Sequence, residues 1–267
     1  MCNMKLGFIG CGNMAGAMMK GIIENKIIAS DSIIGSDVAA ESIEKVKNSL
    51  GITVTSDNTE VVLKADIVVL AVKPQYYENV ISEIKDSVRP EQIIVTIAPG
   101  KTLSWVSDRF GKEVKIVRTM PNTPALVGEG ITAICRNENV NDTELDEVIK
   151  ILKGFGRCEV IAENLMDVVV SVSSSSPAYV FMFIEAMADA AVADGMPRAQ
   201  AYQFAAQAVL GSAKMVLDTG KHPGELKDMV CSPGGTTIEA VRVLEEKGMR
   251  SAVIEAMKAC TKKAKGM

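Results

Sequence analysis

Short apolar runs alternate with amphipathic segments between Lys5 and Glu163. This alternation is typical of a parallel sheet with helices packed on its faces, so we expect an α/β N-terminal domain over residues 1–164. The apolar runs predict strands at 5–10, 32–37, 52–56, 66–72, 93–99, 114–120, 132–136 and 158–162. The amphipathic segments predict helices at 12–24, 40–50, 76–85, 102–110 and 142–154.

The pattern changes after Glu163 and becomes purely helical, which predicts an all-helical C-terminal domain over residues 165–267. The segment 177–195 starts with proline, ends with glycine and carries only three charges. A helix that is apolar on nearly all sides has to be buried on several of them. The rest of the domain is too small for that, so we expect these helices to dimerise with a second copy. Further helices are predicted at 198–218, 223–230, 235–247 and 249–265.

Composition narrows the class of protein. The 267 residues are 48% hydrophobic and 23% charged, which is typical of a globular chain. A net charge of −4 and an aromatic content of 4% argue against nucleic acid as a partner. The six cysteines form no C-x-x-C pair and His222 is the single histidine, so no metal site is expected. Without a charge-free apolar run or a signal-peptide pattern, we expect a cytoplasmic protein with no membrane partner.

A glycine-rich loop joins the first predicted strand to the first predicted helix. The sequence "GFIGCGNMAGAM" contains G-x-G-x-x-A at Gly10, Gly12 and Ala15. In a Rossmann-type fold these positions supply a tight turn, backbone access to a pyrophosphate and close packing of helix on sheet. Glycines close many strand-to-helix turns for structural reasons alone, but the strand-loop-helix context favours dinucleotide binding. The expected contacts are Gly10, Cys11, Gly12, Asn13, Met14 and Ala15.

The end of the second strand leaves the choice of dinucleotide open. An acidic residue there holds the ribose 2′-hydroxyl of NAD, whereas a 2′-phosphate needs neutral or cationic donors. This chain has Ser36 followed by Asp37. The serine could donate to a phosphate and the aspartate could repel it. Two later strands end in "LAVKPQ" and "RTMPNTP", which places Lys73 and Asn122 at the edge where cofactors lie. A solvated lysine before a turn and an ordinary rigid turn are the structural alternatives for these two motifs.

The stretch "VCSPGGTTIEAV" places a Pro-Gly-Gly turn between hydroxyl side chains, directly before a predicted helix. Backbone N–H groups at a helix start bind anions, and glycines let an anion approach the backbone. The segment therefore predicts a carboxylate site that needs no arginine. Ser or Thr acting as an ordinary helix cap is the structural alternative.

Six stretches together closely resemble the pyrroline-5-carboxylate reductase family and span Gly7 to Met257. They read "GFIGCGNMA", "AVKPQ", "RTMPNTPALVGEG", "SPAYVFMFIEAMADAAVADGMPR", "HPGELKDMVCSPGGTTIEAVRVLE" and "GMRSAVIEAM". The resemblance implies hydride transfer from NAD(P)H to the imine carbon of 1-pyrroline-5-carboxylate, the atom that becomes C5 of the product L-proline, in the last step of proline biosynthesis. It also implies a homodimer through the C-terminal helices, with a larger homo-oligomer as the alternative, and NADPH as cofactor, with NADH as the alternative.

The same resemblance implies roles for single residues. The hydroxyl of Thr237 would meet the ring nitrogen and Ser232 the substrate carboxylate, which makes these two the catalytic candidates. The implied substrate contacts are Ser232, Gly234, Gly235, Thr236, Thr237 and Glu163. Beyond the glycine loop, the implied cofactor contacts are Ser36, Asn58, Ala71, Val72, Lys73, Pro74, Ala98 and Asn122. The chain departs from the family pattern at Ser174, Ser176 and Pro99.

Two rival functions remain to be weighed. A β-hydroxyacid dehydrogenase has a similar N-terminal domain but uses a lysine of its helical domain as acid and base. No lysine lies between Glu163 and Ala213 of this chain, which weighs against that rival. A non-enzymatic cofactor sensor is the second rival, and it would not need the arrangement of hydroxyls from Ser232 to Thr237.

Overall fold

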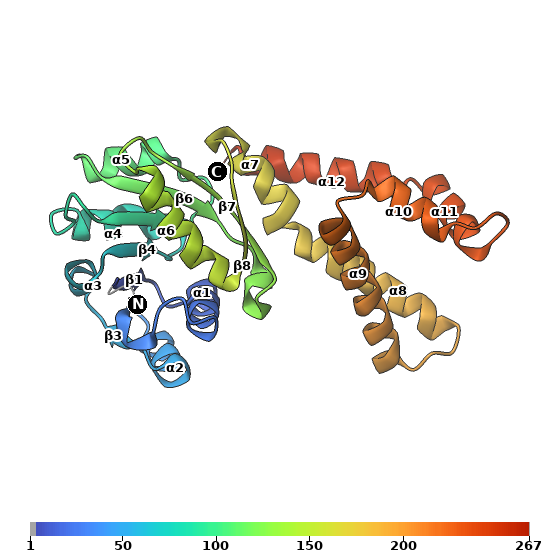
Figure 1. Cartoon of the computed structure of the whole chain (residues 1–267), viewed down its shortest axis with the longest axis horizontal. Helices are drawn as coiled ribbons and strands as arrows, with labels where there is room; N and C mark the ends of the chain where they lie inside the picture. Colours follow the sequence, from blue (N-terminus) through green and yellow to red (C-terminus); the bar gives the residue numbers. More distant parts are fainter. Residues whose placement is uncertain (1–3, 267) are drawn as a thin grey trace. The chain divides into compact units, whose positions relative to one another are not determined.

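The computed structural model describes residues 4–266 and divides by its contacts into two compact units. Unit 1 comprises the chain up to Ser174 together with the segment that starts at Thr261. Unit 2 is Ser175–Cys260. The first unit contains the sheet and the second is helical (Figure 1).

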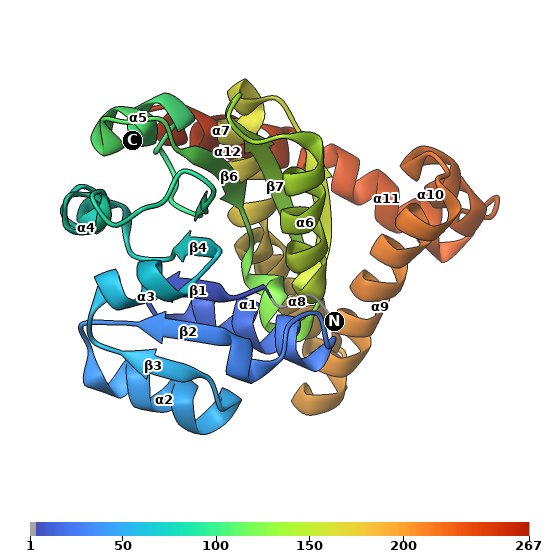
Figure 2. The same ribbon diagram turned by 60° about the vertical axis from the view of Figure 1, so that its left-hand side comes forward.

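Unit 1 is built on one eight-stranded sheet with the strand order β3-β2-β1-β4-β5-β6-β7-β8. Figure 2 shows its first four strands side by side in that order. The strands are β1 Leu6–Ile9, β2 Ile33–Ser36, β3 Thr53–Thr55, β4 Ile67–Leu70, β5 Ile93–Thr96, β6 Lys115–Met120, β7 Gly130–Arg136 and β8 Gly156–Val160. All eight predicted strands are confirmed, and the order reverses at β1, which has β2 on one side and β4 on the other.

One strand pair departs from the expected parallel sheet. β6 and β7 run antiparallel, with Met120 opposite Ala133. Only residues 121–129 connect them, and part of that connection is the short 3₁₀ helix η3, Thr123–Val127. A parallel crossover needs a dozen or more residues, so this connection can only turn the chain back on itself.

Helices cover both faces of the sheet, because successive strand residues point to opposite faces. Phe8 joins the core beneath α1, α2 and α6, whereas Ile9 joins the core beneath α3, α4 and α5. Burial on both faces is why the strands are continuous apolar runs. The helices of this unit are α1 Asn13–Glu24, α2 Ala40–Leu50, α3 Asn58–Lys64, α4 Tyr77–Ile84, α5 Leu103–Phe110, α6 Asp142–Leu152 and α7 Met166–Val169. Single turns complete the unit at η1 Ser30–Ser32, η2 Pro74–Tyr76, η4 Lys153–Phe155, η5 Glu163–Leu165 and the π-helical η6 Val170–Ser174.

The helix α3 was missed by the sequence analysis. Its seven residues carry too short an apolar pattern to stand out, although Val61 and Val62 are fully buried. A local signal was present, since Asp57 caps the helix by accepting a hydrogen bond from the backbone N–H of Thr59. Aspartate is a favoured residue at this position.

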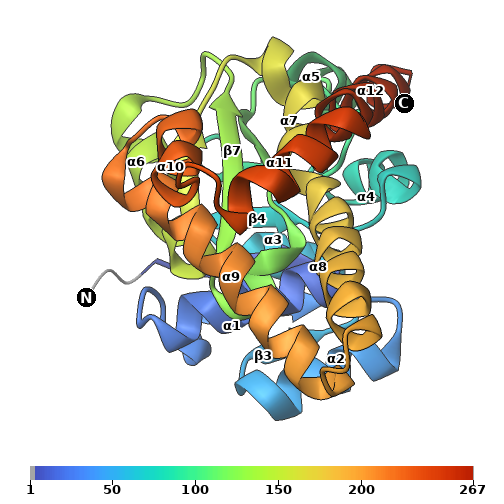
Figure 3. The ribbon, with the colours of Figure 1, turned by 90° about the vertical axis from the view of Figure 1, so that its right-hand side faces the viewer.

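Unit 2 leaves most of its apolar side chains exposed. Its helices are α8 Ser176–Ala193, α9 Arg198–Thr219, α10 Pro223–Val230, α11 Thr236–Glu246 and the start of α12 Met249–Ala264. α8 and α9 pack along each other (Figure 3), yet Ala188 is the single buried residue of α8. Phe181, Met182 and Phe204 are 65%, 69% and 68% exposed. An apolar surface of this extent marks an interaction site.

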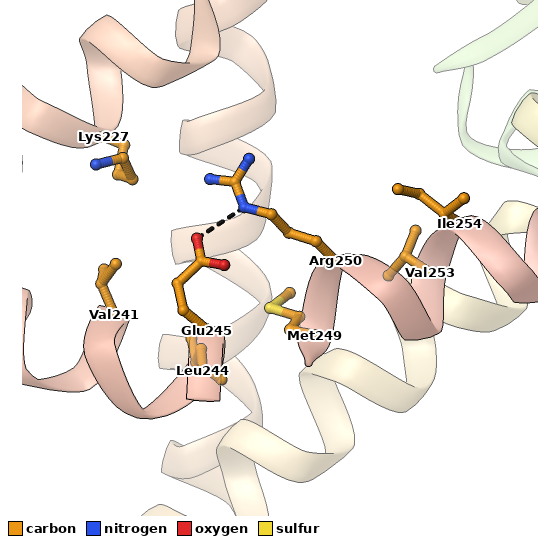
Figure 4. Close-up of a pocket in the computed structure, with 8 residues that line it drawn as sticks. All are labelled: Lys227, Val241, Leu244, Glu245, Met249, Arg250, Val253 and Ile254. Atoms are coloured by element: carbon orange, nitrogen blue, oxygen red, sulfur yellow. Dashed lines mark hydrogen bonds and ion pairs between the residues drawn. The ribbon is translucent and has the colours of Figure 1, made fainter. Parts of the chain in front are cut away.

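A second apolar surface of unit 2 lies in a groove of about 450 Å³ between α10, α11 and α12 (Figure 4). Two of its lining residues, Arg250 and Glu245, form an ion pair with Nε and Oε1 2.7 Å apart. The groove is lined by Lys227, Val241, Leu244, Glu245, Met249, Arg250, Val253 and Ile254.

The helical segment Glu163–Ala193 has a mean hydropathy of 1.4. By length and composition alone, it is apolar and long enough to cross a membrane. The sequence alone predicts no such segment when an apolar run entirely free of charge is required, because this segment contains charged residues. The core helix of a soluble assembly passes the same test, and only 6% of the apolar window is buried within this chain. A second copy that covers α8 therefore accounts for the composition as well as a bilayer does.

We expect wild-type protein to sediment as an assembly of two or more copies, because a monomer would leave the side chains of α8 in water. Phe181→Glu should shift the distribution toward monomer in sedimentation velocity. Val38→Glu is the matched control, since Val38 is a fully exposed apolar residue of unit 1. A monomeric wild type, or equal effects of the two substitutions, would contradict this expectation.

Candidate functional site

The carboxyl ends of β1 and β4 meet at the edge where the strand order reverses, the usual place for ligands in such sheets. Gly10 follows β1 with a φ of +99°. A Cβ atom there would lie 2.8 Å from the carbonyl carbon and oxygen of Ala71, which follows β4. Backbone bonds from Gly10 N to Ser36 O (2.7 Å) and from Ala71 N to Ile9 O (2.8 Å) fix this approach. Only glycine fits at position 10.

Gly12 has a different task. It is the N-cap of α1, no side chain caps the helix there, and a Cβ on Gly12 would meet no protein atom within 4 Å. Packing therefore does not require a glycine at this position. The open space lies in front of the first N–H groups of α1, where the helix dipole favours an anion. Ala15, only 1% exposed, packs one turn further into the core. These features fit the pyrophosphate of a dinucleotide.

A cavity of about 320 Å³ opens beside this loop, and all of its lining residues belong to unit 1. The structure brings together in it seven of the predicted cofactor contacts, namely Met14, Ala71, Val72, Lys73, Pro74, Ala98 and Asn122. Six residues that the sequence analysis did not select as contacts complete the lining, namely Ile97, Pro99, Met120, Pro121, Thr123 and Ser174. Two of these six, Pro99 and Ser174, are positions where the chain departs from the family pattern. The other four lie within two residues of a predicted contact in the sequence. Their position next to Ala98 or Asn122 was the only local indication that they line the cavity.

Two buried polar side chains hold the walls of this cavity. The hydroxyl of Tyr77 donates to the carbonyl of Leu70 and accepts from the N–H of Ile97 at 3.2 Å, which ties together the ends of β4 and β5. Burial raises the pKa of Tyr77, so its proton stays in place. Asn122 donates to the carbonyl of Ser173 at 3.0 Å and accepts from the N–H of Ile131 at 2.9 Å. The amide of Asn122 therefore shapes the wall as well as lining it.

The predicted contacts at the end of β2 lie apart from that cavity. Ser36 is completely buried, and its hydroxyl donates to Asn58 Oδ1 at 2.7 Å. Asn58 in turn donates from Nδ2 to Glu83 Oε2 at 2.8 Å. Asp37 accepts a hydrogen bond from the N–H of Cys11, in the glycine loop, at 2.7 Å. Ser36 and Asn58 are thus brought together, with Asp37 beside the glycine loop.

Glu163 lies in a separate polar cavity of unit 1. Its Oε1 accepts from Leu103 N at 2.7 Å and from Arg118 Nη1 at 2.9 Å. Arg118 is 3% exposed and Glu163 is 33% exposed, so the arginine end of this ion pair is buried and the carboxylate end is partly in contact with solvent. The cavity, of about 320 Å³, is lined by Gly100, Thr102, Arg118, Glu163, Asn164, Asp167, Ala264 and Lys265. No other predicted substrate contact lines it, and the role of Glu163 stays a prediction.

The predicted carboxylate loop lies at the start of α11 in unit 2. Gly234 adopts a φ of +67°, and the N–H of Gly235 donates to the carbonyl of Ser232 at 3.0 Å, which closes the turn. A Cβ on Gly235 would lie 2.4 Å from the Ser232 hydroxyl oxygen, so the glycine makes room for that hydroxyl. Ser232 and Thr236 are exposed, and Thr237 is half-buried.

The cap of α11 separates the two interpretations of this loop. The N-cap is Gly235, and no side chain caps the helix. The alternative of an ordinary Ser or Thr cap is therefore not what the structure shows. Thr237 is the second residue of the helix and so lies in its first turn. The first-turn N–H groups of α11 fit a ligand carboxylate.

The described residues 4–266 contain no group of three or more His, Cys, Asp and Glu side chains that could hold a metal ion. His222 caps α10, where its Nδ1 accepts from the N–H of Gly224 at 3.0 Å. The histidine therefore has a structural task at a helix start.

Two family models match the chain. One, described as "NADP oxidoreductase coenzyme F420-dependent", matches residues 5–100 and covers the glycine loop and most of the residues that line the cavity beside it. The other, described as "Pyrroline-5-carboxylate reductase dimerisation", matches residues 163–267. The second match falls on the helices with the exposed apolar side chains.

Curated relatives match over nearly the full chain. The pyrroline-5-carboxylate reductase of Escherichia coli is 54% identical over 260 residues, which is 97% of each chain. That of Methanosarcina acetivorans is 43% identical over 263 residues, or 98% of this chain and 97% of the relative.

Solved structures agree with these relatives. A pyrroline-5-carboxylate reductase from Coxiella burnetii superposes with a TM-score of 0.92 at 34% identity, covering 99% of this chain and 98% of the other. A pyrroline carboxylate reductase from Plasmodium falciparum, solved with NADP bound, gives a TM-score of 0.89 at 34% identity and the same coverage.

The two glycines of the loop should respond differently to the same substitution. Gly12→Ala should leave the melting temperature nearly unchanged, because the added methyl would meet no protein atom. It should weaken NAD(P)H binding roughly tenfold or more, because the methyl would occupy the space in front of the first N–H groups of α1, where the pyrophosphate is expected. Gly10→Ala should cost about 2 kcal/mol of stability through strain and the clash with Ala71. Melting curves and cofactor titrations check both. A Gly12→Ala variant with wild-type affinity would contradict the assigned task of Gly12.

The thiol of Cys11 should be inert in the folded protein. Burial, with a smaller effect of the Asp37 carboxylate, raises its pKa to about 12. Because the thiolate is the reactive form, iodoacetamide at pH 8 should leave Cys11 unmodified until the protein is unfolded. Peptide mapping by mass spectrometry measures this directly. Rapid labelling of Cys11 in native protein would show that the glycine loop opens.

Proposed function

Because this chain belongs to the pyrroline-5-carboxylate reductase family, we propose how its own residues carry out the reaction of that family. The chain is an NAD(P)H-dependent oxidoreductase that reduces 1-pyrroline-5-carboxylate to L-proline. The structural observation that carries the proposal is the pair of glycine-capped helix starts. Gly12 opens α1 and Gly235 opens α11, and neither helix has a side-chain cap.

The cofactor would be held at the edge of the sheet. We assign its pyrophosphate to the N–H groups that follow Gly12 and its nicotinamide to the cavity lined by Ala71, Lys73 and Ala98. When bound, NAD(P)H supplies the hydride. Apolar walls such as Ile97 and Met120 keep water away from the reacting carbon, and Lys73 offers a cation to a phosphate or a carboxylate.

The imine would be held by the loop before α11. We assign its carboxylate to the first N–H groups of α11 and to the exposed hydroxyl of Ser232. The hydroxyl of Thr237, in the first turn of the same helix, accepts a hydrogen bond from the protonated ring nitrogen. A cyclic imine is basic enough to arrive protonated, so no strong general acid is required. The protein contributes position and electrostatic complementarity.

The catalytic role of Thr237 and Ser232, and the contacts assigned to Gly234, Gly235, Thr236 and Glu163, rest on this chemistry and on the resemblance. For Glu163 the support is that its Oε1 accepts hydrogen bonds from both Leu103 N and Arg118 Nη1. That contact fixes the start of α5 beside the loop at Pro99, which lines the cofactor cavity. Glu163 would then act on the site through its position.

The functional division of the chain remains part of the proposal. We place the dinucleotide-binding domain at residues 1–164 and the helical substrate and dimerisation domain at 165–267, although contacts alone group the chain differently. The chain forms a homo-oligomer through its dimerisation segment. A homodimer in the cytoplasm, without nucleic acid or membrane as partner, is the form we propose.

The direct test follows the absorbance of NADPH or NADH with purified protein and racemic 1-pyrroline-5-carboxylate. Oxidation that depends on the imine, with L-proline as product, is the expected result. A protein that binds either cofactor in a separate titration but turns over neither would overturn the proposed function and return the cofactor sensor as the better account.

Thr237→Val keeps the shape of the side chain and removes its hydroxyl. A hydrogen bond to a charged group contributes about 1.5–3 kcal/mol, so kcat/KM for the imine should fall about tenfold to a hundredfold. Thr237→Ser, which keeps the hydroxyl, should retain most of the activity. The Kd for NAD(P)H should stay unchanged in both variants. Equal kcat/KM for the Val and Ser variants would remove the Thr237 hydroxyl from the mechanism.

A further inference from the structure

The two nicotinamide cofactors differ at one position, where NADPH carries a 2′-phosphate and NADH a 2′-hydroxyl on the adenosine ribose. We propose that Asp37 reads this position and makes the chain prefer NADH, with NADPH bound more weakly. The inference rests on the proposed function for its reaction, but its observable is cofactor binding. Four observations at the end of β2 carry it.

The first is the position of the carboxylate. Asp37 directly follows β2, the strand whose end contacts the adenosine ribose in folds of this kind. Its Oδ2 accepts from the N–H of Cys11 at 2.7 Å and its Oδ1 accepts from the N–H of Ala39 at 2.9 Å. Both oxygens are fixed, one of them by the glycine loop itself. A carboxylate held this way accepts a further bond from a ribose hydroxyl and repels a phosphate.

The second observation is that the neighbouring hydroxyl is used elsewhere. Ser36, the residue that could have donated to a 2′-phosphate, is completely buried and donates to Asn58 Oδ1. The Asn58 amide then donates to Glu83, an exposed carboxylate. This series of hydrogen bonds therefore ends on another acid, and the hydroxyl donor of Ser36 is already engaged.

The third observation is the charge around these strand ends. No lysine or arginine occurs from residue 27 to 44, which includes all of β2 and the loop that follows it. After β3 come Asp57 and Glu60, and Lys64 on α3 pairs with Glu60 at 2.6 Å. A 2′-phosphate brings up to two negative charges into this acidic surrounding, where like charges repel.

The fourth observation concerns two lysines that line a groove together with residues of the glycine loop. Lys20 and Lys45 line a groove of about 480 Å³ together with Cys11 and Gly12, on the side of α1 and α2. Lys20 lies 3.8 Å from Glu24 and is partly neutralised by it. Lys45 is the cation that could contact a 2′-phosphate and so oppose the effect of Asp37. The experiment therefore includes a Lys45 variant.

The experiment measures the Kd values of NADH and NADPH by isothermal titration calorimetry, with wild type and three variants and without imine. Asp37→Asn removes the charge but keeps an acceptor for one of the two backbone N–H groups. Val38→Arg adds a cation next to Asp37 at a fully exposed position and leaves the carboxylate in place. Lys45→Gln removes the competing cation. Thermal melting verifies that each variant folds.

Wild type should bind NADH more tightly than NADPH, by about tenfold. Asp37→Asn should tighten NADPH binding about tenfold and weaken NADH binding severalfold, and Val38→Arg should tighten NADPH binding with little change for NADH. Lys45→Gln should change the two Kd values equally. Tighter NADPH binding in wild type, an Asp37→Asn variant with an unchanged ratio of Kd values, or a loss confined to NADPH in Lys45→Gln would overturn the inference. The binding ratios hold whether or not the imine turns over, so failure of the proposed reaction is recognised separately.

Discussion

The close approach of Gly10 to Ala71 is the contact on which the candidate cofactor site depends. It joins the ends of β1 and β4 at the one place where the strand order reverses, and a side chain at position 10 would push them apart. The approach sets where α1 begins, and with it the open space at Gly12. Tyr77 extends the same edge to β5, so the walls of the cavity are fixed by backbone contacts and buried hydrogen bonds. Contacts within the protein itself therefore shape the candidate site.

The same physical device occurs twice in this chain. α1 and α11 both start at a glycine N-cap with an extended backbone and no capping side chain. A Ser or Asp in that position would satisfy one of the free N–H groups and stabilise the helix, relative to glycine, by roughly a few tenths of a kcal/mol. Leaving both helices uncapped gives up this stability and keeps two anion sites, one suited to a pyrophosphate and one to a small carboxylate. In the proposed function the chain would hold two anionic ligands with backbone N–H groups, which fits the small number of cations in its candidate sites.

What the sequence could predict follows from the range of each contact. The glycine loop, the eight strands and the start of α11 are local patterns, and all of them could be predicted. The antiparallel β7 could have been foreseen from the length of its connection, and α3 from the cap at Asp57. The hydrogen bonds of Ser36 to Asn58 and of Glu163 to Leu103 join residues 22 and 60 positions apart. No local pattern encodes such pairs, so the burial of Ser36 and the fixed carboxylate of Asp37 required the structure.

The proposed function requires that the two glycine-capped helix starts, at Gly12 and Gly235, bind the anionic groups of cofactor and substrate. Backbone amide shifts measured by two-dimensional ¹H–¹⁵N NMR on the intact protein test this most directly, first with ADP-ribose and then with L-proline. The proposed function predicts that ADP-ribose changes the amide shifts of Gly12 and Asn13, and that L-proline changes those of Thr236 and Thr237. Shifts from either ligand that leave these amides in place while others move would contradict it.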